Sequence, residues 1–501
     1  MRICLLAHAF TPYEVTGVEN HTAQLARGLV EAGVEVQVFA PGPATGTWRL
    51  SQRLEERDGY EIHWLAVGER RPDDEGNEPG VAEAFGRYLD RERPELVHAQ
   101  HLIGLGPELV FEAKRRGMPF LFTAHDAWLV SEEYRLLRPD LTPLEPTDTG
   151  AMARVLLGRK LLDRLIPDTD HQGLATPADL SEEGRSLLAE VLDGDPSAAG
   201  FSDDELEALL RRAEAGREAR LRAVGAMDLL ISPTRFLAGV LEGGGVSAPL
   251  VVEACGIDSA QFEGCVGPES GADGPLRIAY LGGISKHKGL DDLLEALDGL
   301  YGATLHIHGG SSDRAYTDRC RERAEELGAE WFGPFVNEDL PKILGEIDVV
   351  VVPSKWPENA PFVIREAFAA GVPVVAADVG AMRESIRDGV DGWLYPAGDV
   401  AALRDRLKEL IEKRSALFEA ASAVQPPRTI QAQVASLLRH YKEHAPSALA
   451  HPSGHLEHLC DFTRRYEEVH DMRWDALVEG ALEGYSVCAR GSLESALAAS
   501  A

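Results

Sequence analysis

The chain has no apolar run long enough to cross a bilayer. A membrane-spanning helix needs about 20 consecutive apolar residues, and no segment of the 501 residues approaches that length. The stretch from Met1 to Phe10 is apolar over only part of its length and runs into a Pro-Tyr turn, which predicts a first strand and not a signal peptide. We therefore expect a cytoplasmic protein.

Paired cysteine spacing is also missing, which excludes a disulfide framework and suits a reducing compartment. The six cysteines are Cys4, Cys255, Cys265, Cys320, Cys460 and Cys488. Metal-binding residue types gather near the C-terminus, at His455, His458, Cys460 and His470. Their spacing matches no strong zinc pattern, so we expect no metal and no bound cofactor.

Positive charge is scarce, since nine lysines and 41 arginines stand against 82 acidic residues and give a formal net charge of −32. An acidic surface repels nucleic acid and anionic lipid over the chain as a whole, so no nucleic-acid partner is expected. Acid-rich, lysine-poor composition is typical of salt-adapted proteins, because carboxylates keep a protein hydrated when salt screens its charge. A halophilic origin is therefore a hypothesis that the composition supports.

Two blocks of alternating strand and helix patterns divide the chain. The first block predicts strands at Arg2–Ala7, Val34–Ala40, Glu61–Leu65, Leu96–Ala99, Phe120–Ala124 and Leu229–Ser232, and helices at Thr22–Ala32, Gly80–Arg93, Leu105–Arg116 and Asp204–Ala223. The second block repeats the pattern at Arg277–Leu281, Gly289–Leu300, Ala303–His308, Thr317–Leu327, Val349–Pro353, Pro361–Ala370 and Val372–Ala377. This alternation predicts an α/β protein with two doubly wound, Rossmann-like domains. Ligands of such sheets bind outside the carboxyl ends of the strands, so the site is expected in a cleft between the two facing domains.

The predicted domains occupy residues 1–261 and 276–427, and a linker rich in Gly, Glu, Asp and Pro joins them at 262–275. Three segments do not fit the plain pattern. They are a helical insertion at about 139–203, a helix at 428–445, and a C-terminal extension at 446–501 of unknown role.

Glu358 and Glu366 bracket the start of a helix that follows the strand-forming stretch Ile347 to Pro353. A helix N-terminus offers unpaired N–H groups and a partial positive charge, which together favour a phosphate group. Pro361 lies where a first-turn proline loses no hydrogen bond. The two acids place acceptors on either side of this anion site, as binding a sugar diphosphate would require. The pair alone is equally consistent with helix-end glutamates that interact with the helix dipole and aid solubility.

Lys286 and Lys288 follow the first strand of the second block, where an ammonium group can neutralise diphosphate charge. Gly17 lies in the turn after the first strand, and a glycine there lets the backbone approach a ligand closely. His125 ends an apolar strand and is therefore placed at the rim of the sheet; the alternative is a loop-capping histidine. His98 and His101 end the preceding strand and are expected to line the same cleft, either in structural roles or as support for the residues that contact the ligand.

Glutamate, seven intervening residues and glutamate at a strand-to-helix turn resembles the donor motif of the family-four retaining glycosyltransferases (glycosyl transferases group 1), which have the GT-B fold. The resemblance covers roughly residues 1–138 and 204–445, and its most specific part runs from Lys288 through Glu384. Two positions depart from the family pattern. The chain has Thr16-Gly17 where family members commonly have two glycines, and Gly283 where many relatives carry arginine.

The resemblance implies roles for individual residues. Glu358 would contact hexose hydroxyls, Glu366 would contact the ribose hydroxyls, and His125 would donate to a hexose hydroxyl. His125, Lys288 and Glu358 would form the catalytic group. The donor-binding set would be Gly17, Gly283, Lys286, Asn359, Phe362, Val363, Glu366 and Gly380. The helix at Thr429–His444 would cross back onto the first domain.

The resemblance also implies an activity. A hexose would move from a nucleotide-diphosphate sugar, a UDP- or GDP-sugar as co-substrate, to the hydroxyl of a sugar or lipid-linked acceptor. No metal would be needed, the anomeric configuration would be retained, and the pathway would be cell-envelope or exopolysaccharide assembly. Two alternatives stay open: a nucleotide-sugar epimerase or hydrolase of the same fold, and a non-catalytic sugar-nucleotide-binding protein.

The insertion contains a basic amphipathic stretch, Met152 to Ile166, with four cations and one acid. Its apolar residues fall at 152, 155, 156, 162, 165 and 166, close to a helical stripe. Such a helix can lie on an anionic membrane and present a lipid-linked acceptor, which predicts weak peripheral contact at the inner membrane face. The alternative is that the stripe covers its own domain.

Overall fold

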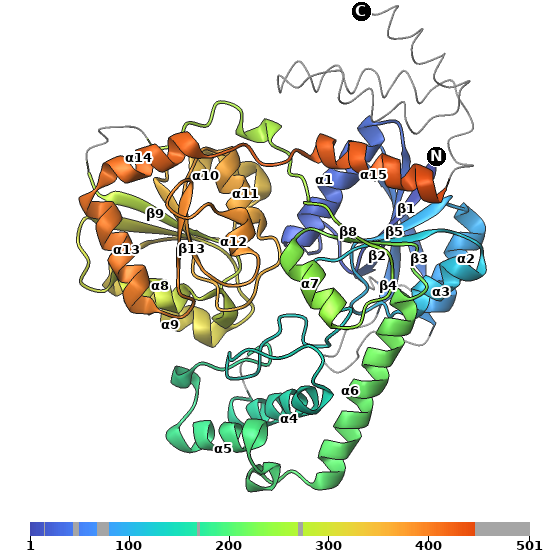
Figure 1. Cartoon of the computed structure of the whole chain (residues 1–501), viewed down its shortest axis with the longest axis horizontal. Coiled ribbons are helices and arrows are strands. Elements are labelled where there is room, and N and C mark those ends of the chain that lie inside the picture. Colours follow the sequence, from blue (N-terminus) through green and yellow to red (C-terminus); the bar gives the residue numbers. More distant parts are fainter. Residues whose placement is uncertain (15, 44–49, 68–79, 168–170, 269–273, 446–501) are drawn as a thin grey trace, which may run out of the picture.

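The computed structural model describes residues 1–14, 16–43, 50–67, 80–167, 171–268 and 274–445 (Figure 1). They form two α/β domains, a helical insertion and a final helix that returns to the first domain. The predicted extension at 446–501, with its histidines and Cys460, lies outside the described residues.

The first domain is built on an eight-stranded sheet with the strand order β3-β4-β2-β1-β5-β6-β7-β8. All neighbouring strands are parallel except β3, which pairs antiparallel with β4. The strands are β1 (Arg2–Leu6), β2 (Glu35–Pro43), β3 (Gln52–Arg57), β4 (Tyr60–Val67), β5 (Leu96–Ala99), β6 (Phe120–Thr123), β7 (Leu229–Ser232) and β8 (Leu250–Val252). The helices beside it are α1 (Gly17–Glu31), α2 (Val81–Glu92), α3 (Glu108–Arg115) and α7 (Arg235–Gly243).

The second domain has a six-stranded parallel sheet with the order β11-β10-β9-β12-β13-β14. Its strands are β9 (Leu276–Leu281), β10 (Ala303–His308), β11 (Glu330–Gly333), β12 (Val349–Val352), β13 (Val374–Ala377) and β14 (Gly392–Tyr395). Its helices are α8 (Leu290–Leu297), α9 (Arg314–Glu326), α10 (Leu340–Leu344), α11 (Phe362–Ala369), α12 (Met382–Ser385), α13 (Val400–Glu412) and α14 (Arg414–Ala423). Short 3-10 turns occur at Pro177–Asp179, Pro196–Ala199, Ala260–Phe262, Lys286–Lys288 and Asn337–Asp339.

Each sheet separates two apolar cores. In the first domain, α2, α3 and α7 pack on one face and α1 on the other. In the second domain, α8, α9 and α13 cover one face, and α10, α11 and α12 cover the opposite face. A sheet covered on both faces requires strands that are apolar throughout, and β12, with the sequence Val-Val-Val-Val, is fully buried. The predicted fold class, two Rossmann-like domains, is confirmed.

Strand register brings functional loops to a common edge. Leu6, near the end of β1, lies opposite Phe39 in β2 and Ala99 in β5, and Ala99 lies opposite Phe122 in β6. The segments that follow β1, β5 and β6 therefore leave the first sheet side by side, at the carboxyl edge where ligands of such sheets bind.

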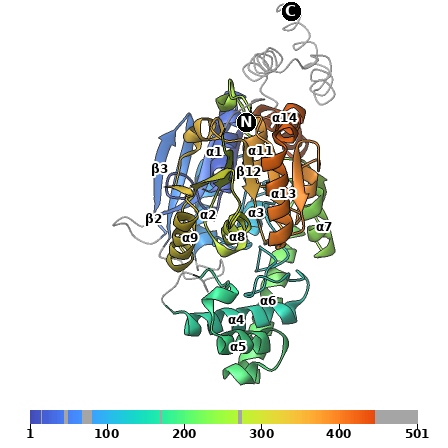
Figure 2. The same ribbon diagram turned by 90° about the vertical axis from the view of Figure 1, so that its left-hand side faces the viewer.

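The insertion folds as a separate helical unit, with α4 (Thr149–Leu165), α5 (Glu182–Asp193) and the N-terminal half of α6 (Asp203–Val224) around their own apolar core. Figures 1 and 2 show this unit projecting from the two sheet domains, with α6 connecting it to the first. Met152, Val155, Leu156 and Leu162 are buried in that core. Most of the apolar stripe thus packs within the insertion's own core, as the alternative interpretation expected. Among the described residues, no helix is both long and apolar enough to span a membrane.

The last described helix, α15 (Ile430–His444), lies against α1 of the first domain (Figure 1). Its residues Ile430, Val434, Leu437 and Tyr441 are buried in the core on that face of the sheet. A β-carbon on Gly28 of α1 would lie 3.1 Å from Val434, so the two helices pack closely because Gly28 has no side chain.

The chain passes between the domains twice, and the two passages are hydrogen-bonded to each other. The Ile257 amide donates to the Arg428 carbonyl at 3.0 Å, and the Ile430 amide donates to the Ile257 carbonyl at 2.8 Å. Gly256 is required at this point, since a β-carbon there would lie 2.2 Å from the carbonyl oxygen of Thr429. Phe262, placed at the start of the predicted linker, is instead buried in the core of the second domain.

Candidate active site

The strand-to-helix segment of the second domain places Glu358 beside Lys288. The Nζ atom of Lys288 donates to Oε1 of Glu358 at 2.7 Å, and the hydroxyl of Ser354 donates to the same oxygen at 2.7 Å. Glu358 is 5% exposed. Lys288 is more open to solvent, and its ammonium lies 5.2 Å from the centroid of the Trp356 ring. The two residues meet because they follow β9 and β12, which are neighbours in the sheet. The predicted catalytic lysine and glutamate are therefore brought together as an ion pair.

Glu366 lies in α11, one turn beyond Phe362, and is half-buried. Burial raises the pKa of its carboxyl to about 7, against the opposing effect of the Arg365 charge. Within the described part of the chain its carboxylate has no hydrogen-bond partner. A carboxylate that has lost water without gaining a protein donor is suited to accept hydroxyl groups of a ligand.

The N-terminus of α11 meets the first domain. Pro361 is the residue before the first helical position and not, as predicted, a residue of the first turn. The Phe362 and Val363 amides thus lie in the first turn, where N–H groups have no partner within the helix. The Phe362 ring stacks on the His21 ring with centroids 5.0 Å apart. A β-carbon at Gly17 would lie 2.9 Å from the same ring, so this contact needs a glycine.

Asn359 differs from its predicted role. Its Oδ1 accepts a hydrogen bond from the Thr234 hydroxyl at 2.6 Å, and its Nδ2 donates to the carbonyls of Ala124 and His125 at 3.3 and 3.2 Å. The side chain is 5% exposed. Every one of these partners belongs to the first domain, so Asn359 joins the two domains.

Gly380 supports the Glu358 segment from the next loop. It adopts a φ of 59°, and a β-carbon there would lie 2.4 Å from the Glu358 carbonyl. The Ala381 amide donates to that same carbonyl at 2.8 Å. Just beyond this loop, in α12, Glu384 accepts hydrogen bonds from the amides of Arg235 and Phe236 at the start of α7. This is a second point where the domains are joined.

The loop after β9 does not expose both of its lysines. Lys286 is 3% exposed and pairs with Asp313, the residue that caps the N-terminus of α9. Its charge is already neutralised, which differs from the predicted phosphate contact. Gly283 is exposed, and a β-carbon there would meet no atom within 4 Å. The arginine that many relatives carry would have open space at this position.

His125 lies at the carboxyl edge of the first sheet, directly after β6. Its Nε2 is 3.1 Å from Oε1 of Gln100. Burial lowers the pKa of His125 to about 3, and the neighbouring His101 acts in the same direction. The ring is therefore neutral at physiological pH. His101 itself is buried and lies 3.0 Å from Oδ2 of Asp126, and His98 is fully buried behind the site.

The comparisons with known proteins agree with this arrangement. Residues 268–423 match the family model of glycosyl transferases group 1, and residues 16–158 match that of the glycosyl transferase 4-like domain. The chain belongs to the group 1 glycosyltransferases. The segment matched by the first model contains Lys288, Glu358, Glu366 and Gly380, and the segment matched by the second contains Gly17 and His125.

Curated relatives of this glycosyltransferase match only part of it. It is 33% identical over 191 residues to the D-inositol 3-phosphate glycosyltransferase of Mycolicibacterium smegmatis, covering 35% of the chain and 44% of the relative. It is 32% identical over 172 residues to the phosphatidyl-myo-inositol mannosyltransferase of Mycobacterium leprae, covering 32% and 46%. The chain thus spans less than half the length of either relative.

Solved glycosyltransferase structures share the fold over a much larger part. Sucrose-phosphate synthase from Thermosynechococcus elongatus superposes with a TM-score of 0.59 at 18% identity, over 89% of this chain and 99% of that one. Anabaena HepE in complex with UDP gives 0.55 at 16% identity, over 88% and 100%. At these identities the likeness shows the fold alone, which is GT-B.

Several residues at the candidate site escaped the sequence analysis. His21 lay just outside the predicted helix, which was expected to begin at Thr22, whereas α1 begins at Gly17. The signal was present, because Thr16 and Glu19 form a capping box that marks the helix start. Thr234 and Gln100 carry no local signal, since their partners lie far away in the chain.

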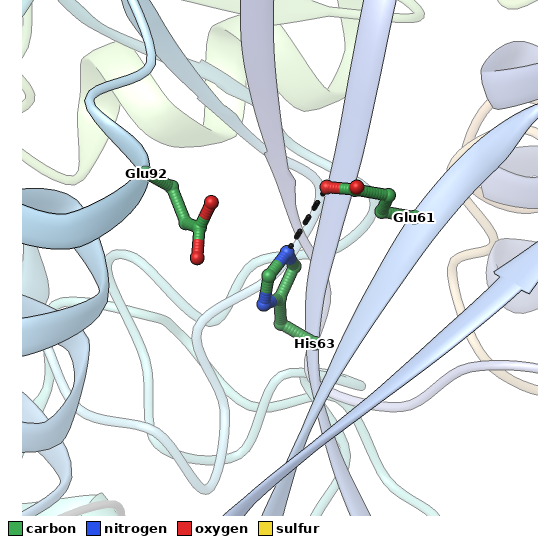
Figure 3. Close-up of side chains that lie close together, drawn as sticks. All are labelled: Glu61, His63 and Glu92. Atoms are coloured by element: carbon green, nitrogen blue, oxygen red, sulfur yellow. Dashed lines mark ion pairs between the residues drawn. The ribbon is translucent and has the colours of Figure 1, made fainter.

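A separate cluster of possible metal ligands lies away from the site, where β4 begins and α2 ends (Figure 3). Glu61, His63 and Glu92 have ligand atoms within 4.8 Å of one another. The Gln37 amide donates to Glu61 at 2.8 Å, and the Arg91 guanidinium donates to Glu92 at 2.5 Å. These donors already serve both carboxylates and disfavour a cation between them.

Proposed function

We propose that the protein is a retaining glycosyltransferase that moves a hexose from a UDP- or GDP-sugar to a hydroxyl acceptor. The observation that carries the proposal is the Lys288–Glu358 ion pair beside the open N-terminus of α11, with the unpartnered Glu366 carboxylate in the same helix. A diphosphate needs a cation and free N–H groups, and the sugar hydroxyls at its two ends need acceptors. These features lie together in the second domain, in the segments that follow the neighbouring strands β9 and β12.

The charges suggest what happens when a donor enters. Lys288 would turn from Glu358 to the diphosphate, and Glu358 would then be free to accept from hexose hydroxyls. As the bond to the anomeric carbon breaks, Lys288 and the amides of Phe362 and Val363 would stabilise the charge on the departing diphosphate. This stabilisation is strongest where water is excluded, which the contacts of Asn359 and Glu384 between the domains favour.

The acceptor would approach from the first domain, where the segments after β1, β5 and β6 meet. Proton transfer from the acceptor hydroxyl to a leaving-group oxygen on the same face of the sugar would retain the configuration without a protein base. The neutral state of His125 fits this scheme, since it would bind a hydroxyl without removing its proton. We propose a cytoplasmic, metal-independent reaction in cell-envelope or exopolysaccharide assembly. The names of the two relatives, a D-inositol 3-phosphate glycosyltransferase and a phosphatidyl-myo-inositol mannosyltransferase, suggest polyol phosphates and lipid-linked acceptors for the first trials.

The test begins with calorimetry of UDP-, GDP- and ADP-sugars against the full chain and its Glu366→Ala variant. We expect one sugar nucleotide to bind and the variant to bind it at least tenfold more weakly, as for loss of a hydrogen bond to a charged group. Glu412→Ala, an exposed change in α13, is the matched control. No binding of any sugar nucleotide to the wild type would contradict the proposal.

The reaction type needs product analysis. Incubation with the bound donor and candidate acceptors should give a new glycoside, and NMR of its anomeric proton should show the configuration of the donor. Turnover that is equally fast without acceptor would instead indicate an epimerase or hydrolase. Binding without turnover under any condition would indicate a non-catalytic sugar-nucleotide-binding protein.

A further inference from the structure

A buried hydrogen-bonded chain of side chains connects α15 with His125. Oη of Tyr441 lies 2.7 Å from Nδ1 of His98, and Nε2 of His98 lies 2.8 Å from Oγ1 of Thr123 and 3.3 Å from Nε2 of Gln100. Oε1 of Gln100 then lies 3.1 Å from Nε2 of His125. All of these side chains except His125 are at most 1% exposed. This series of hydrogen bonds runs from α15 to the edge of the candidate site.

The positions of the protons follow from which atoms can donate. The amide oxygen of Gln100 carries no hydrogen, so the contact at 3.1 Å requires His125 to carry its proton on Nε2. The amide nitrogen of Gln100 then donates to Nε2 of His98, which must be unprotonated. His98 consequently carries its proton on Nδ1 and donates to Tyr441. Three of the four ring nitrogens of His98 and His125 are thereby assigned as donor or acceptor.

Both histidines are held neutral. Burial lowers the pKa of His98 to about 3 and the pKa of His125 to about 3. Around His125, the charges of His101 and Arg365 oppose protonation, and only Asp126 favours it. Nδ1 of His125 therefore keeps a lone pair. No hydrogen bond to this atom occurs among the described residues.

We propose that Gln100 is a positioning residue that holds His125 as its Nε2–H tautomer, so that Nδ1 accepts a hydrogen bond from a substrate hydroxyl. The identity of that hydroxyl rests on the proposed function, whereas the tautomer does not. The polarity is opposite to the sequence expectation, in which His125 donates to the sugar. Tyr441 anchors the arrangement from α15, so this helix contributes to the geometry of the candidate site.

The tautomer can be measured without any substrate. In the full chain labelled with 15N-histidine, the His125 signals are assigned from their loss in His125→Gln. We expect Nδ1 to have the chemical shift of an unprotonated ring nitrogen and Nε2 that of a protonated one. In Gln100→Leu the two shifts should move toward each other, because nothing then selects one tautomer. A wild type protonated at Nδ1, or a Gln100→Leu spectrum identical to that of the wild type, would overturn the proposal.

Two further variants test the proposal if Gln100→Leu folds poorly. Gln100→Glu retains an acceptor for His125, so the Nε2–H tautomer should persist and the pKa of His125 should rise. Tyr441→Phe removes the anchoring hydroxyl with little change in shape and should shift the His98 signals. Tyr60→Phe, a core tyrosine of the same domain outside the chain of hydrogen bonds, is the control. A Gln100→Glu variant in which His125 switches to Nδ1–H would also contradict the proposal.

Kinetics link the tautomer to the reaction. With an active donor–acceptor pair, Gln100→Leu should lower kcat about tenfold, as for one lost hydrogen bond in the transition state, and leave the donor KM nearly unchanged. Gln52→Leu, a change at the edge of the sheet, should alter neither. If no transfer is found, the proposed function fails but the NMR result still decides the role of Gln100. An altered KM with unchanged kcat would show that Gln100 acts only on binding.

Discussion

The ammonium of Lys288 lies 2.7 Å from the carboxylate of Glu358. Each residue thereby neutralises the charge of the other. If a diphosphate took the place of Glu358 beside Lys288, one anionic partner would replace another and the ammonium would stay paired. The pair therefore keeps the site ready for a diphosphate at little cost to the stability of the fold.

We expect Lys288→Ala to lower kcat by about 10²- to 10³-fold, the range seen when one group that stabilises a developing negative charge is removed. The donor KM should change much less. Stopped assays with the preferred sugar nucleotide measure both values. Lys408→Ala, which removes an exposed lysine of α13, is the control. Equal kcat in the wild type and Lys288→Ala would discredit the site.

The raised pKa of Glu366 predicts a dependence of stability on pH. Between its ordinary value of 4.5 and about 7, the folded protein holds a proton that the unfolded chain releases. The contribution to stability is thus complete below pH 4.5 and is lost as the pH rises to 7. Relative to Glu366→Gln, the wild type should lose thermal stability across this window. A constant difference in Tm from pH 4.5 to 7.5 would show that the carboxyl titrates normally.

The same group predicts how donor affinity varies with pH. An ionised carboxylate accepts hydrogen bonds from ribose hydroxyls more strongly than a protonated one. The donor Kd should therefore rise as the pH falls below 7, and Glu366→Gln should remove this dependence. Calorimetry at pH 5.5, 6.5 and 7.5 checks it. If the donor Kd of the wild type and that of Glu366→Gln changed equally with pH, the contact between Glu366 and the ribose hydroxyls would be contradicted.

Asn359 predicts an effect on domain closure. Asn359→Ala removes three hydrogen bonds between the domains, to Thr234, Ala124 and His125. We expect a larger radius of gyration by small-angle scattering and a higher donor KM. The control is Asn337→Ala, which lies in the second domain away from the junction. Unchanged scattering would show that the Glu384 contacts and the double crossing are enough to hold the domains together.

The insertion reaches the second domain through Asp179 and Arg319, which lie 2.5 Å apart. Gln172 of the insertion also donates to Ser312 at 3.0 Å. We expect Arg319→Glu to destabilise this contact and Asp179→Arg to restore part of it, with a coupling of about 0.5–1 kcal/mol for a partly exposed pair. Urea unfolding of the wild type, the two single variants and the double variant measures this coupling energy. Arg314→Glu, on the same helix but 93% exposed, controls for the change in charge. Additive effects of the two changes would rule out coupling.

The acidic composition predicts a response to salt. If the net charge of −32 reflects salt adaptation, Tm should rise from low to molar KCl. Tm should rise because salt screens the repulsion between the carboxylates of the folded protein. A series in KCl, with a conventional mesophilic protein measured alongside, tests the hypothesis. A flat or falling curve would count against it.

Much of the fold could be predicted because both sheets are buried on both faces. Leu96–Ala99, Leu229–Ser232 and Ala303–His308 were predicted to the residue, since short apolar runs between polar segments mark such strands. The strand Gln52–Arg57 was missed because it is polar, exposed and paired on one side only. The early start of α1 was missed although its capping box is local.

The site was predictable only where neighbouring strands bring motifs together. Lys288 follows β9 and Glu358 follows β12. Because these two strands are neighbours in the sheet, the two sequence motifs meet in space. The partners of Lys286 and Asn359, which are Asp313 and Thr234, were not predicted because they come from segments far away in the sequence. Gln100 and Tyr441 are linked across 341 positions by way of His98. Such long-range pairings follow from the tertiary fold and leave no periodic trace in the sequence.

The two passages of chain between the domains, tied together at Ile257 and Arg428–Ile430, define how the protein can open. A single flexible connection would let one lobe rotate and twist freely about the other. Two hydrogen-bonded passages of chain instead resist twisting and favour a swing about one axis. A junction of this kind would bring the lobes back to the same alignment each time they close.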